Sequence, residues 1–242
     1  MDREYCRWFS PHLDREMELL VFGHAGAKVL VFPTRQGRFF DYESWGLIDA
    51  LAQSIERGFL QVFCVDSIDS ESLYCHSAPP LARIARHKRY EQYILREVIP
   101  LMCGSSQSSF LIAHGCSIGA YHAVTLALRH PGLFGKVVAL SGRYDLTKPV
   151  GPFADLFDGY YDEDIYFYTP THFLPQWEEP AALLAIRRTE IVLAVGEDDC
   201  FKSSTEQLSH QLSSKGVPHT LAIWSGEAHK ACHWRQMVRL YL

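Results

Sequence analysis

The chain has 242 residues, of which 48% are hydrophobic and 21% are charged, a composition typical of a globular protein with a substantial core. A formal net charge of -5, without a long basic run, argues against a nucleic-acid-binding surface. The first residues carry charges where a signal peptide needs apolar side chains, and no apolar run reaches the ~18 residues of a membrane span. We therefore expect a globular protein with neither a nucleic-acid nor a membrane partner.

The seven cysteines are an odd number and are scattered along the chain. They lack Cys-x-x-Cys spacing, and the histidines lack His-Glu-x-x-His spacing, so the sequence predicts neither a disulfide framework nor a metal site. Free thiols in a reducing cytoplasm are the simplest explanation, although one isolated pair could still bridge in the fold. We expect a cytoplasmic protein that uses no cofactor.

Apolar runs typical of strands alternate with amphipathic stretches typical of helices along most of the chain. The predicted strands are 17–22, 28–32, 60–65, 110–113, 136–140, 191–195 and 220–224. The predicted helices are 43–55, 81–101, 121–129, 204–214 and 232–241. This alternation predicts an α/β fold with a mostly parallel central sheet and helices on both faces. The first two strands, separated by a turn at 25–27, predict a hairpin-like antiparallel edge.

Residues 149–180 interrupt the alternation, because they have no clear strand or helix period and are rich in aromatic side chains. A long irregular excursion between sheet strands is usually functional, so we expect a cap-like segment over the active site, within a single domain spanning 1–242. The predicted substrate pocket draws on four of its rings, Phe153, Phe157, Tyr160 and Tyr161. Roughly half of the aromatic residues in the segment should instead pack against the sheet as core.

The most informative stretch is Gly115-Cys116-Ser117-Ile118-Gly119, which lies between a predicted strand and a predicted helix. A strand, a Gly-x-Ser-x-Gly turn and a helix together predict a nucleophile elbow. The turn is so sharp that the central residue adopts strained backbone angles, and glycine on both sides removes the Cβ atoms that would collide. This arrangement exposes the Ser117 hydroxyl at the edge of the sheet, as a nucleophile requires.

A serine hydroxyl needs a base to take its proton and an acid to orient that base. On this fold the expected chain order is serine, acid and histidine. After the strand at 191–195 comes Gly196-Glu197-Asp198-Asp199, and after the strand at 220–224 comes Gly226-Glu227-Ala228-His229. Both groups follow carboxyl ends of strands, as Ser117 does, and this edge is where open α/β sheets hold their sites.

Asp199 is favoured as the acid because it has the Gly-x-x-Asp spacing, and Asp198 and Glu197 remain alternatives. His229 is the expected base because it has both the right order and a strand-end position, with His233 as the fallback.

An acyl-transfer site also needs donors for the oxyanion that develops on the substrate. One expected donor is the backbone N–H of Ile118, the residue after the nucleophile. The second is the backbone N–H of Thr34 or Arg35, in the loop after the strand at 28–32. Alternatively, the side chains of Arg35 and Arg38 could bind a carboxylate or phosphate on the substrate.

Three parts of the chain together resemble the Putative esterase family of α/β-hydrolases, which includes S-formylglutathione hydrolase, feruloyl esterases and mycolyltransferases. They are the helix from Tyr90 to Leu101, the elbow from Gly115 to Ala123, and the two strand ends that carry Asp199 and His229. The resemblance runs over nearly the whole chain. It implies an α/β-hydrolase fold with Ser117 as nucleophile, Asp199 as acid and His229 as base.

Two departures from the family pattern bear on substrate preference more than on the triad. The elbow has Gly119-Ala120 where Gly-Gly is frequent, which narrows the space beside the serine. Lys230-Ala231 follow the histidine where the family often has Asp-Trp, so Trp234 is expected to supply that packing.

These features predict a serine hydrolase, a carboxylesterase that cleaves small-molecule carboxylic esters or thioesters through an acyl-enzyme. Two alternatives remain: an acyltransferase that uses the same triad, and a non-catalytic binding module with the α/β-hydrolase fold. The sequence leaves the substrate, the acyl-chain preference and the presence of a homo-oligomer open.

Overall fold

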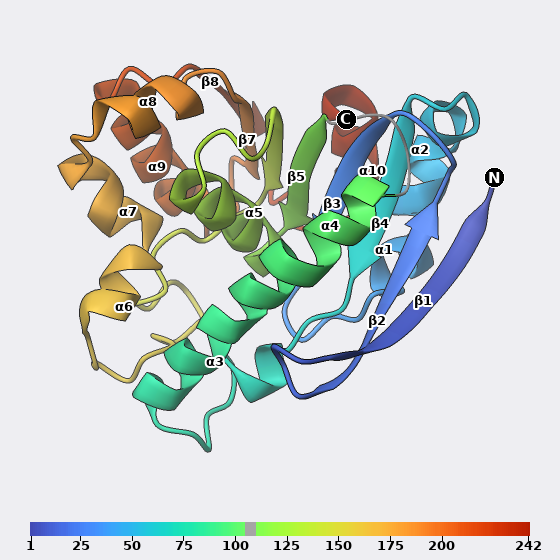
Figure 1. The fold of residues 1–242 in the computed structure, drawn as a ribbon. Coiled ribbons are helices and arrows are strands. Elements are labelled where there is room, and N and C mark those ends of the chain that lie inside the picture. Colours follow the sequence, from blue (N-terminus) through green and yellow to red (C-terminus); the bar gives the residue numbers. More distant parts are fainter. Residues whose placement is uncertain (105–109) are drawn as a thin grey trace.

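The computed structural model describes residues 1–104 and 110–242, and within them eight strands form one sheet in the order β1-β2-β4-β3-β5-β6-β7-β8 (Figure 1). The strands are β1 (Arg3–Ser10), β2 (Arg15–Phe22), β3 (Ala27–Phe32), β4 (Leu60–Val65), β5 (Leu111–Cys116), β6 (Lys136–Leu140), β7 (Glu190–Gly196) and β8 (His219–Trp224). The six strands from β4 to β8 in this order pair in parallel. The apolar runs of β4, β3, β5, β6 and β7 are buried by helices on both faces, whereas β8, at the edge of the sheet, is only partly buried. The predicted α/β fold with a mostly parallel sheet is confirmed.

The antiparallel edge differs from the prediction in its partners. β2 pairs with β1 on one side and with β4 on the other, and it does not form a hairpin with β3. β1 was missed because most of its side chains are exposed, so it lacks the apolar signal of a buried strand. The strands β2 and β3 follow one another in the chain but are not neighbours in the sheet, because β4 lies between them.

Helices cover both faces of the sheet. They are α1 (Asp41–Ser44), α2 (Leu47–Glu56), α3 (Pro80–Tyr93), α4 (Ile99–Gly104), α5 (Ile118–Arg129), α6 (Glu163–Phe167), α7 (Pro170–Phe173), α8 (Pro180–Ile186), α9 (Lys202–Ser214) and α10 (Ala231–Tyr241). Short 3₁₀ segments are η1 (Asp69–Glu71) and η3 (Leu174–Gln176), and η2 (Ile94–Val98) is a π-helical segment that joins α3 to α4. Apolar residues of α3, α4, α5 and α9 pack on one face, and those of α2 and α10 pack on the other. The predicted helix 43–55 is divided at Gly46, whose φ of 72° is outside the helical range.

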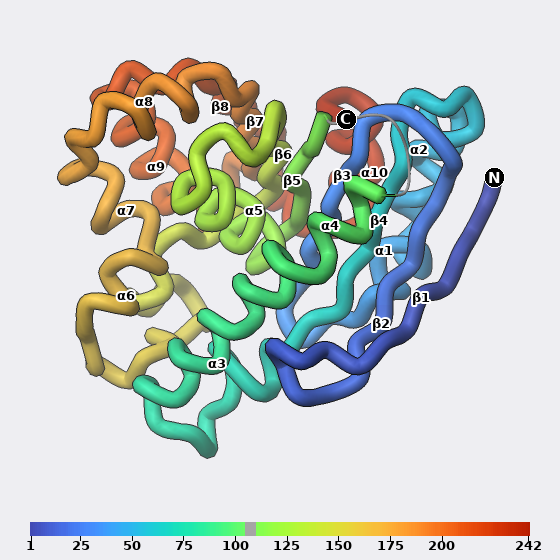
Figure 2. The backbone as a smooth tube through the Cα atoms, viewed as in Figure 1, coloured from blue at the N-terminus to red at the C-terminus, as the bar shows by residue number. Residues whose placement is uncertain are grey.

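The segment predicted as a cap contains the short helices α6 and α7 and the start of α8, and it is not wholly irregular. In the backbone trace it is the yellow part at the left, beside the start of α3 (Figure 2). Its buried side chains Leu156, Phe157, Ile165 and Tyr168 share a small apolar cluster with Ile118 and other residues. This cluster fixes the excursion against the N-terminal end of α5, next to the predicted nucleophile.

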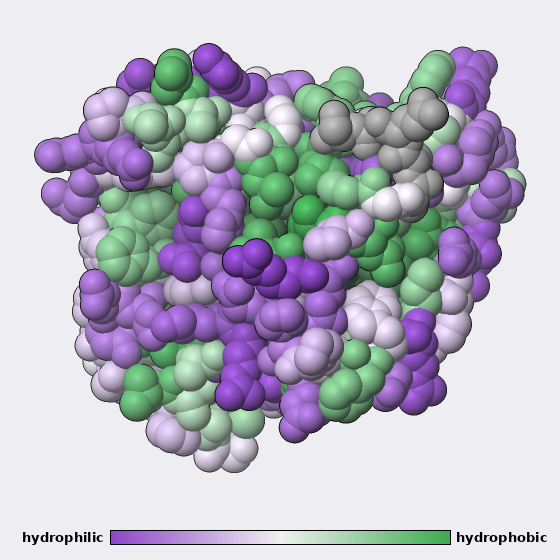
Figure 3. All heavy atoms as spheres, viewed as in Figure 1, coloured by the Kyte–Doolittle hydropathy of each residue, from purple (hydrophilic) through white to green (hydrophobic). Residues whose placement is uncertain are grey.

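The space-filling view shows polar side chains over the middle of α3 and apolar ones in the hollow between α4 and α5 (Figure 3). Within the described residues, no helix combines the length and apolarity needed to cross a membrane.

Candidate active site

Ser117 occupies the sharp turn between β5 and α5 and has the strained backbone angles φ 59° and ψ -121°. A Cβ atom on Gly115 would lie 2.3 Å from the carbonyl carbon of Gly119, so glycine is required on the strand side of the turn. A Cβ atom on Gly119 would lie 2.4 Å from the carbonyl oxygen of Phe32, so glycine is required on the helix side too. This is the backbone geometry that the Gly-x-Ser-x-Gly pattern predicts.

The ends of β7 and β8 bring an acid and an imidazole together. Gly196 pairs with Trp224 at these ends, and a Cβ atom on Gly196 would lie 2.0 Å from the carbonyl oxygen of Glu227. The two loops that follow are therefore in close contact, and the N–H of Asp198 donates to the carbonyl oxygen of Gly226 at 3.0 Å. Glycine at the end of β7 thus allows residues 30 positions apart to meet.

His229 Nδ1 lies 3.0 Å from Oδ2 of Asp199. An ionised carboxylate only accepts hydrogen bonds, so Nδ1–H donates, and Nε2 remains free to take a proton. Burial raises the pKa of Asp199, but hydrogen bonds from His229 and from the N–H of Phe201 at 2.9 Å outweigh it, and the pKa lies below its usual value. The buried acid is therefore held as a carboxylate behind the imidazole.

Aromatic rings fix the orientation of the imidazole. The ring centroid of His229 is 5.4 Å from that of Phe201 and 5.2 Å from that of Trp234, both in edge-on contacts. Trp234 in turn donates from Nε1 to the hydroxyl of Ser141 at 3.3 Å. The ring is thus confined between two aromatic side chains, one of which is itself anchored.

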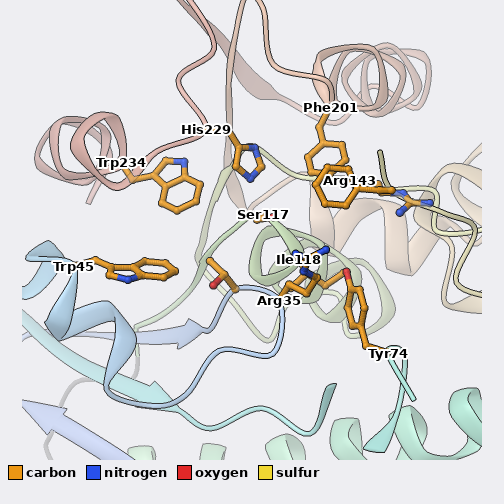
Figure 4. Close-up of a pocket in the computed structure, with 11 residues that line it drawn as sticks. Arg35, Trp45, Tyr74, Ser117, Ile118, Arg143, Phe201, His229 and Trp234 are labelled. Atoms are coloured by element: carbon orange, nitrogen blue, oxygen red, sulfur yellow. The ribbon is translucent and has the colours of Figure 1, made fainter. Parts of the chain in front are cut away.

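Ser117 and His229 border the same cavity, which has a volume of about 240 Å³. Its lining residues are Thr34, Arg35, Trp45, Tyr74, Ser117, Ile118, Arg143, Phe153, Phe201, His229 and Trp234. The imidazole lies above Ser117 in the close-up of this cavity (Figure 4). Among the described residues, the structure has no hydrogen bond between the Ser117 hydroxyl and this ring. Such bonds are often long in free enzymes and tighten when substrate binds.

The loop after β3 contributes the other side of the predicted oxyanion site. Phe32 pairs with Gly115, so β3 and the elbow strand end at the same level, and Thr34, Arg35 and Ile118 all border the cavity. Within the described chain, the backbone N–H groups of these three residues have no hydrogen-bond partner. They are therefore available to an oxyanion at Ser117.

Buried acidic residues hold this loop in place. Asp69 is 2% exposed, and its Oδ2 accepts a hydrogen bond from the N–H of Gln36 at 3.0 Å. Its Oδ1 lies 3.6 Å from Nε2 of His122, on α5. The loop is thereby connected to the same helix that begins at the elbow.

Three of the four predicted pocket aromatics are elsewhere, and Phe153 alone of the four borders the cavity. Phe157 is 1% exposed and belongs to the apolar cluster at the start of α5. Tyr160 and Tyr161 are exposed, and their hydroxyls bond to Asp162 and His172. These rings thus face the core or the solvent, and the short helix α6 that follows them was not predicted from the sequence.

The alternative site residues also lie away from the cavity. Asp198 and Glu197 are exposed, and His233 does not border the cavity. The Arg38 guanidinium is paired with Asp66 at 2.9 Å and with Glu18 at 2.6 Å, so it is not free to bind a substrate anion.

Four lining residues were not singled out in the sequence: Trp45, Tyr74, Arg143 and Phe201. Phe201 and Arg143 follow the carboxyl ends of β7 and β6, so the strand-end rule that found Asp199 could have found them. Trp45 and Tyr74 come from loops whose path is set only by tertiary packing.

Comparison with known families decides the identity of the chain. The model of the family described as Putative esterase matches residues 70–236, which is more than half of the chain and includes Ser117, Asp199 and His229. The chain belongs to this family. It is therefore an esterase-type enzyme.

Solved structures show that this esterase has the α/β-hydrolase fold. A ferulic acid esterase is 14% identical, with a TM-score of 0.78 over 99% of this chain and 95% of the other. The S-formylglutathione hydrolase FrmB from Staphylococcus aureus is 18% identical, with a TM-score of 0.72 over 99% and 94% of the two chains. An S-formylglutathione hydrolase from Agrobacterium tumefaciens is 16% identical, with a TM-score of 0.75 over 98% and 91%. No curated protein matches the sequence significantly.

Proposed function

We propose that this esterase cleaves small-molecule carboxylic esters or thioesters with Ser117 as nucleophile, His229 as general base and Asp199 as the acid that orients it. The single observation that carries the proposal is the 3.0 Å contact between His229 Nδ1 and Asp199 Oδ2 beside the cavity that Ser117 borders. It leaves Nε2 of the imidazole as the proton acceptor on the side of the serine.

In the first half of the reaction, His229 takes the proton of Ser117 while the serine oxygen attacks the ester carbonyl. The N–H of Ile118 and that of Thr34 or Arg35 donate to the oxyanion of the tetrahedral intermediate. His229 then gives its proton to the departing alcohol or thiol, which leaves an acyl-Ser117 enzyme. Water activated by the same imidazole attacks that acyl group and releases the acid.

Labelling of Ser117 by a fluorophosphonate probe tests the proposal directly. The wild-type enzyme should react with the probe and hydrolyse 4-nitrophenyl esters of short acids. Ser117→Ala should abolish labelling and lower kcat by about 10⁴-fold or more. Absence of both labelling and turnover in a folded wild-type protein would contradict the proposal and favour a binding module.

Transfer of the acyl group to an alcohol uses the same residues and differs only in the final acceptor. Product analysis with a short alcohol present at high concentration separates the two reactions. A hydrolase should give free acid as its product even when the alcohol is present, whereas an acyltransferase should give the ester of the added alcohol.

A further inference from the structure

The cavity beside Ser117 has two chemically different sides. Trp45 and Trp234 lie on one side of the serine, and Arg35, Tyr74 and Arg143 lie on the other (Figure 4). None of the described residues that border the cavity is acidic. One end of the cavity is thus apolar and the other carries two positive charges.

Arg143 is the more unusual of the two arginines because it is buried, with 3% of its surface exposed. Its Nε donates to the carbonyl oxygen of Asp145 at 3.1 Å, and its Nη2 donates to the carbonyl oxygens of Lys148 and of Ala154, the latter at 2.8 Å. Within the described chain, Nη1 has no hydrogen-bond partner and no carboxylate forms an ion pair with the guanidinium. A buried charge without a counter-ion is costly, unless a ligand supplies that counter-ion.

The two carboxylates closest to Arg143 in sequence, those of Asp145 and Asp155, already bind other groups. Asp145 accepts hydrogen bonds from Thr147, and it lies 3.2 Å from His172 and 3.0 Å from Lys148. Asp155 accepts from the backbone N–H groups of Phe157 and Gly159, at 2.7 and 2.6 Å. Both act on Arg143 over a longer distance and leave its free edge unneutralised.

Arg35 adds a second positive charge at the same end. Its guanidinium lies over the ring of Phe153, 5.6 Å from the centroid, and among the described residues it has no ion pair. Arg38, three positions further along the loop, is neutralised by Asp66 and Glu18. Carboxylates from β2 and from the end of β4 therefore neutralise the loop arginine outside the cavity, whereas Arg35, which borders the cavity, has no such partner among the described residues.

We propose that Arg35 and Arg143 bind a negatively charged group, such as a carboxylate, on the substrate, so that the preferred esters carry an anion in addition to the ester bond. A guanidinium matches the planar geometry of a carboxylate and gains from charge-assisted hydrogen bonds. The inference rests on the proposed function of Ser117. It assigns the neutral part of the substrate to the side of Trp45 and Trp234.

Two pairs of shape-matched esters test the inference by kcat/KM. The first pair places the charge on the acid: 4-nitrophenyl hydrogen succinate and the neutral 4-nitrophenyl 4-methylpentanoate. The second pair places it on the alcohol: 4-carboxyphenyl butyrate and the neutral 4-isopropylphenyl butyrate. In at least one pair the anionic ester should be favoured by roughly 10- to 100-fold. Equal or lower kcat/KM for the anionic ester in both pairs overturns the inference, while turnover itself leaves the proposed function standing.

Variants assign the preference to the arginines. Arg35→Gln should lower the ratio of anionic to neutral kcat/KM about tenfold. This side chain is exposed, and among the described residues its contact with the ring of Phe153 is not accompanied by an ion pair. Arg143→Lys should lower the ratio as well. Arg89→Gln, which removes an exposed arginine on α3, should leave the ratio at the wild-type value. A ratio that is unchanged in Arg35→Gln and Arg143→Lys contradicts the inference.

Binding to the Ser117→Ala protein tests the anion site without catalysis. Monomethyl succinate should shift the NMR signals of the tryptophan side chains in a saturable way, and methyl butyrate should bind at least tenfold more weakly. Arg35→Gln in the same background should weaken binding of the anion. Equal binding of the two compounds sinks the inference, whereas failure of fluorophosphonate labelling in the wild type sinks the proposed function.

Discussion

Gly119 lies directly against Phe32: a Cβ atom on the glycine would be 2.4 Å from the carbonyl oxygen of the last residue of β3. The start of α5 is therefore pressed onto the end of β3, where the loop with Thr34 and Arg35 begins. This contact sets the N–H of Ile118 beside the other predicted oxyanion donors. The absence of a Cβ atom at Gly119 thus allows the elbow to pack against the loop that carries Thr34 and Arg35.

Gly119→Ala should separate these two halves. The added methyl group meets backbone oxygens of both Phe32 and Pro33, which cannot rotate away as a side chain would. We expect a loss of stability of about 2 kcal/mol or more, or a loss of kcat of about 100-fold if the loop moves instead. Urea unfolding and ester hydrolysis measure the two effects. Gly104→Ala is the control, because a Cβ atom there meets nothing within 4 Å.

Asp199→Asn should lower kcat by about 10³- to 10⁴-fold with little change in KM, because an amide no longer holds the imidazole in the productive tautomer. Asp198→Asn is the matched control, since that side chain is exposed. Steady-state kinetics on one 4-nitrophenyl ester compares the two. A larger loss of kcat in Asp198→Asn than in Asp199→Asn would assign the acid to Asp198 and contradict the proposed triad.

Trp234→Phe keeps an aromatic ring against His229 but removes the Nε1 donor to Ser141. A hydrogen bond of this kind contributes about 1 kcal/mol, so kcat should fall about fivefold, with a similar cost in stability. Trp177→Phe, outside the cavity, gives the general cost of the same substitution. Equal effects of the two variants on kcat would show that the anchoring bond has no role in catalysis.

Stability should fall as pH decreases from 6.5 to 5, because of buried histidines. Burial, helped by His122 and Arg129 and opposed by Glu91, lowers the pKa of His87 from 6.5 to about 3, and burial lowers that of His114 to about 4. Between the folded and unfolded pKa values the unfolded chain binds more protons, so the free energy of unfolding rises with pH. Each group contributes a slope of up to about 1.4 kcal/mol per pH unit.

Urea unfolding at several pH values between 5 and 7.5 measures this slope. His87→Gln should reduce the slope by the contribution of one proton, up to about 1.4 kcal/mol per pH unit. His24→Gln, at an exposed position, should leave the slope unchanged. A slope that is the same in all three proteins would mean that His87 is protonated in the folded state.

Short-range sequence signals were enough to predict most of the sheet and the elbow. Apolar runs located β3 to β7 because these strands are buried on both faces, and the run 220–224 located β8 although that edge strand is only partly buried. The two glycines located Ser117 because only glycine fits the turn. The exposed strand β1 gave no such signal. Pairing of β2 with β1 and β4 depends on contacts between distant segments, which no local pattern contains.

The sequence by itself determined the sheet type, the chain order of serine, acid and histidine, and the edge of the sheet where all three lie, because these follow from periodicity and from glycine stereochemistry. Only the tertiary structure decided that Asp199, and not Asp198, contacts His229, and that Phe157, Tyr160 and Tyr161 lie away from the cavity. The strand-end rule places Arg143 at the same edge of the sheet, but only the tertiary structure decided that its charge is buried beside the cavity. The direction of a loop side chain depends on what packs around it, and that packing comes from residues far away in the chain.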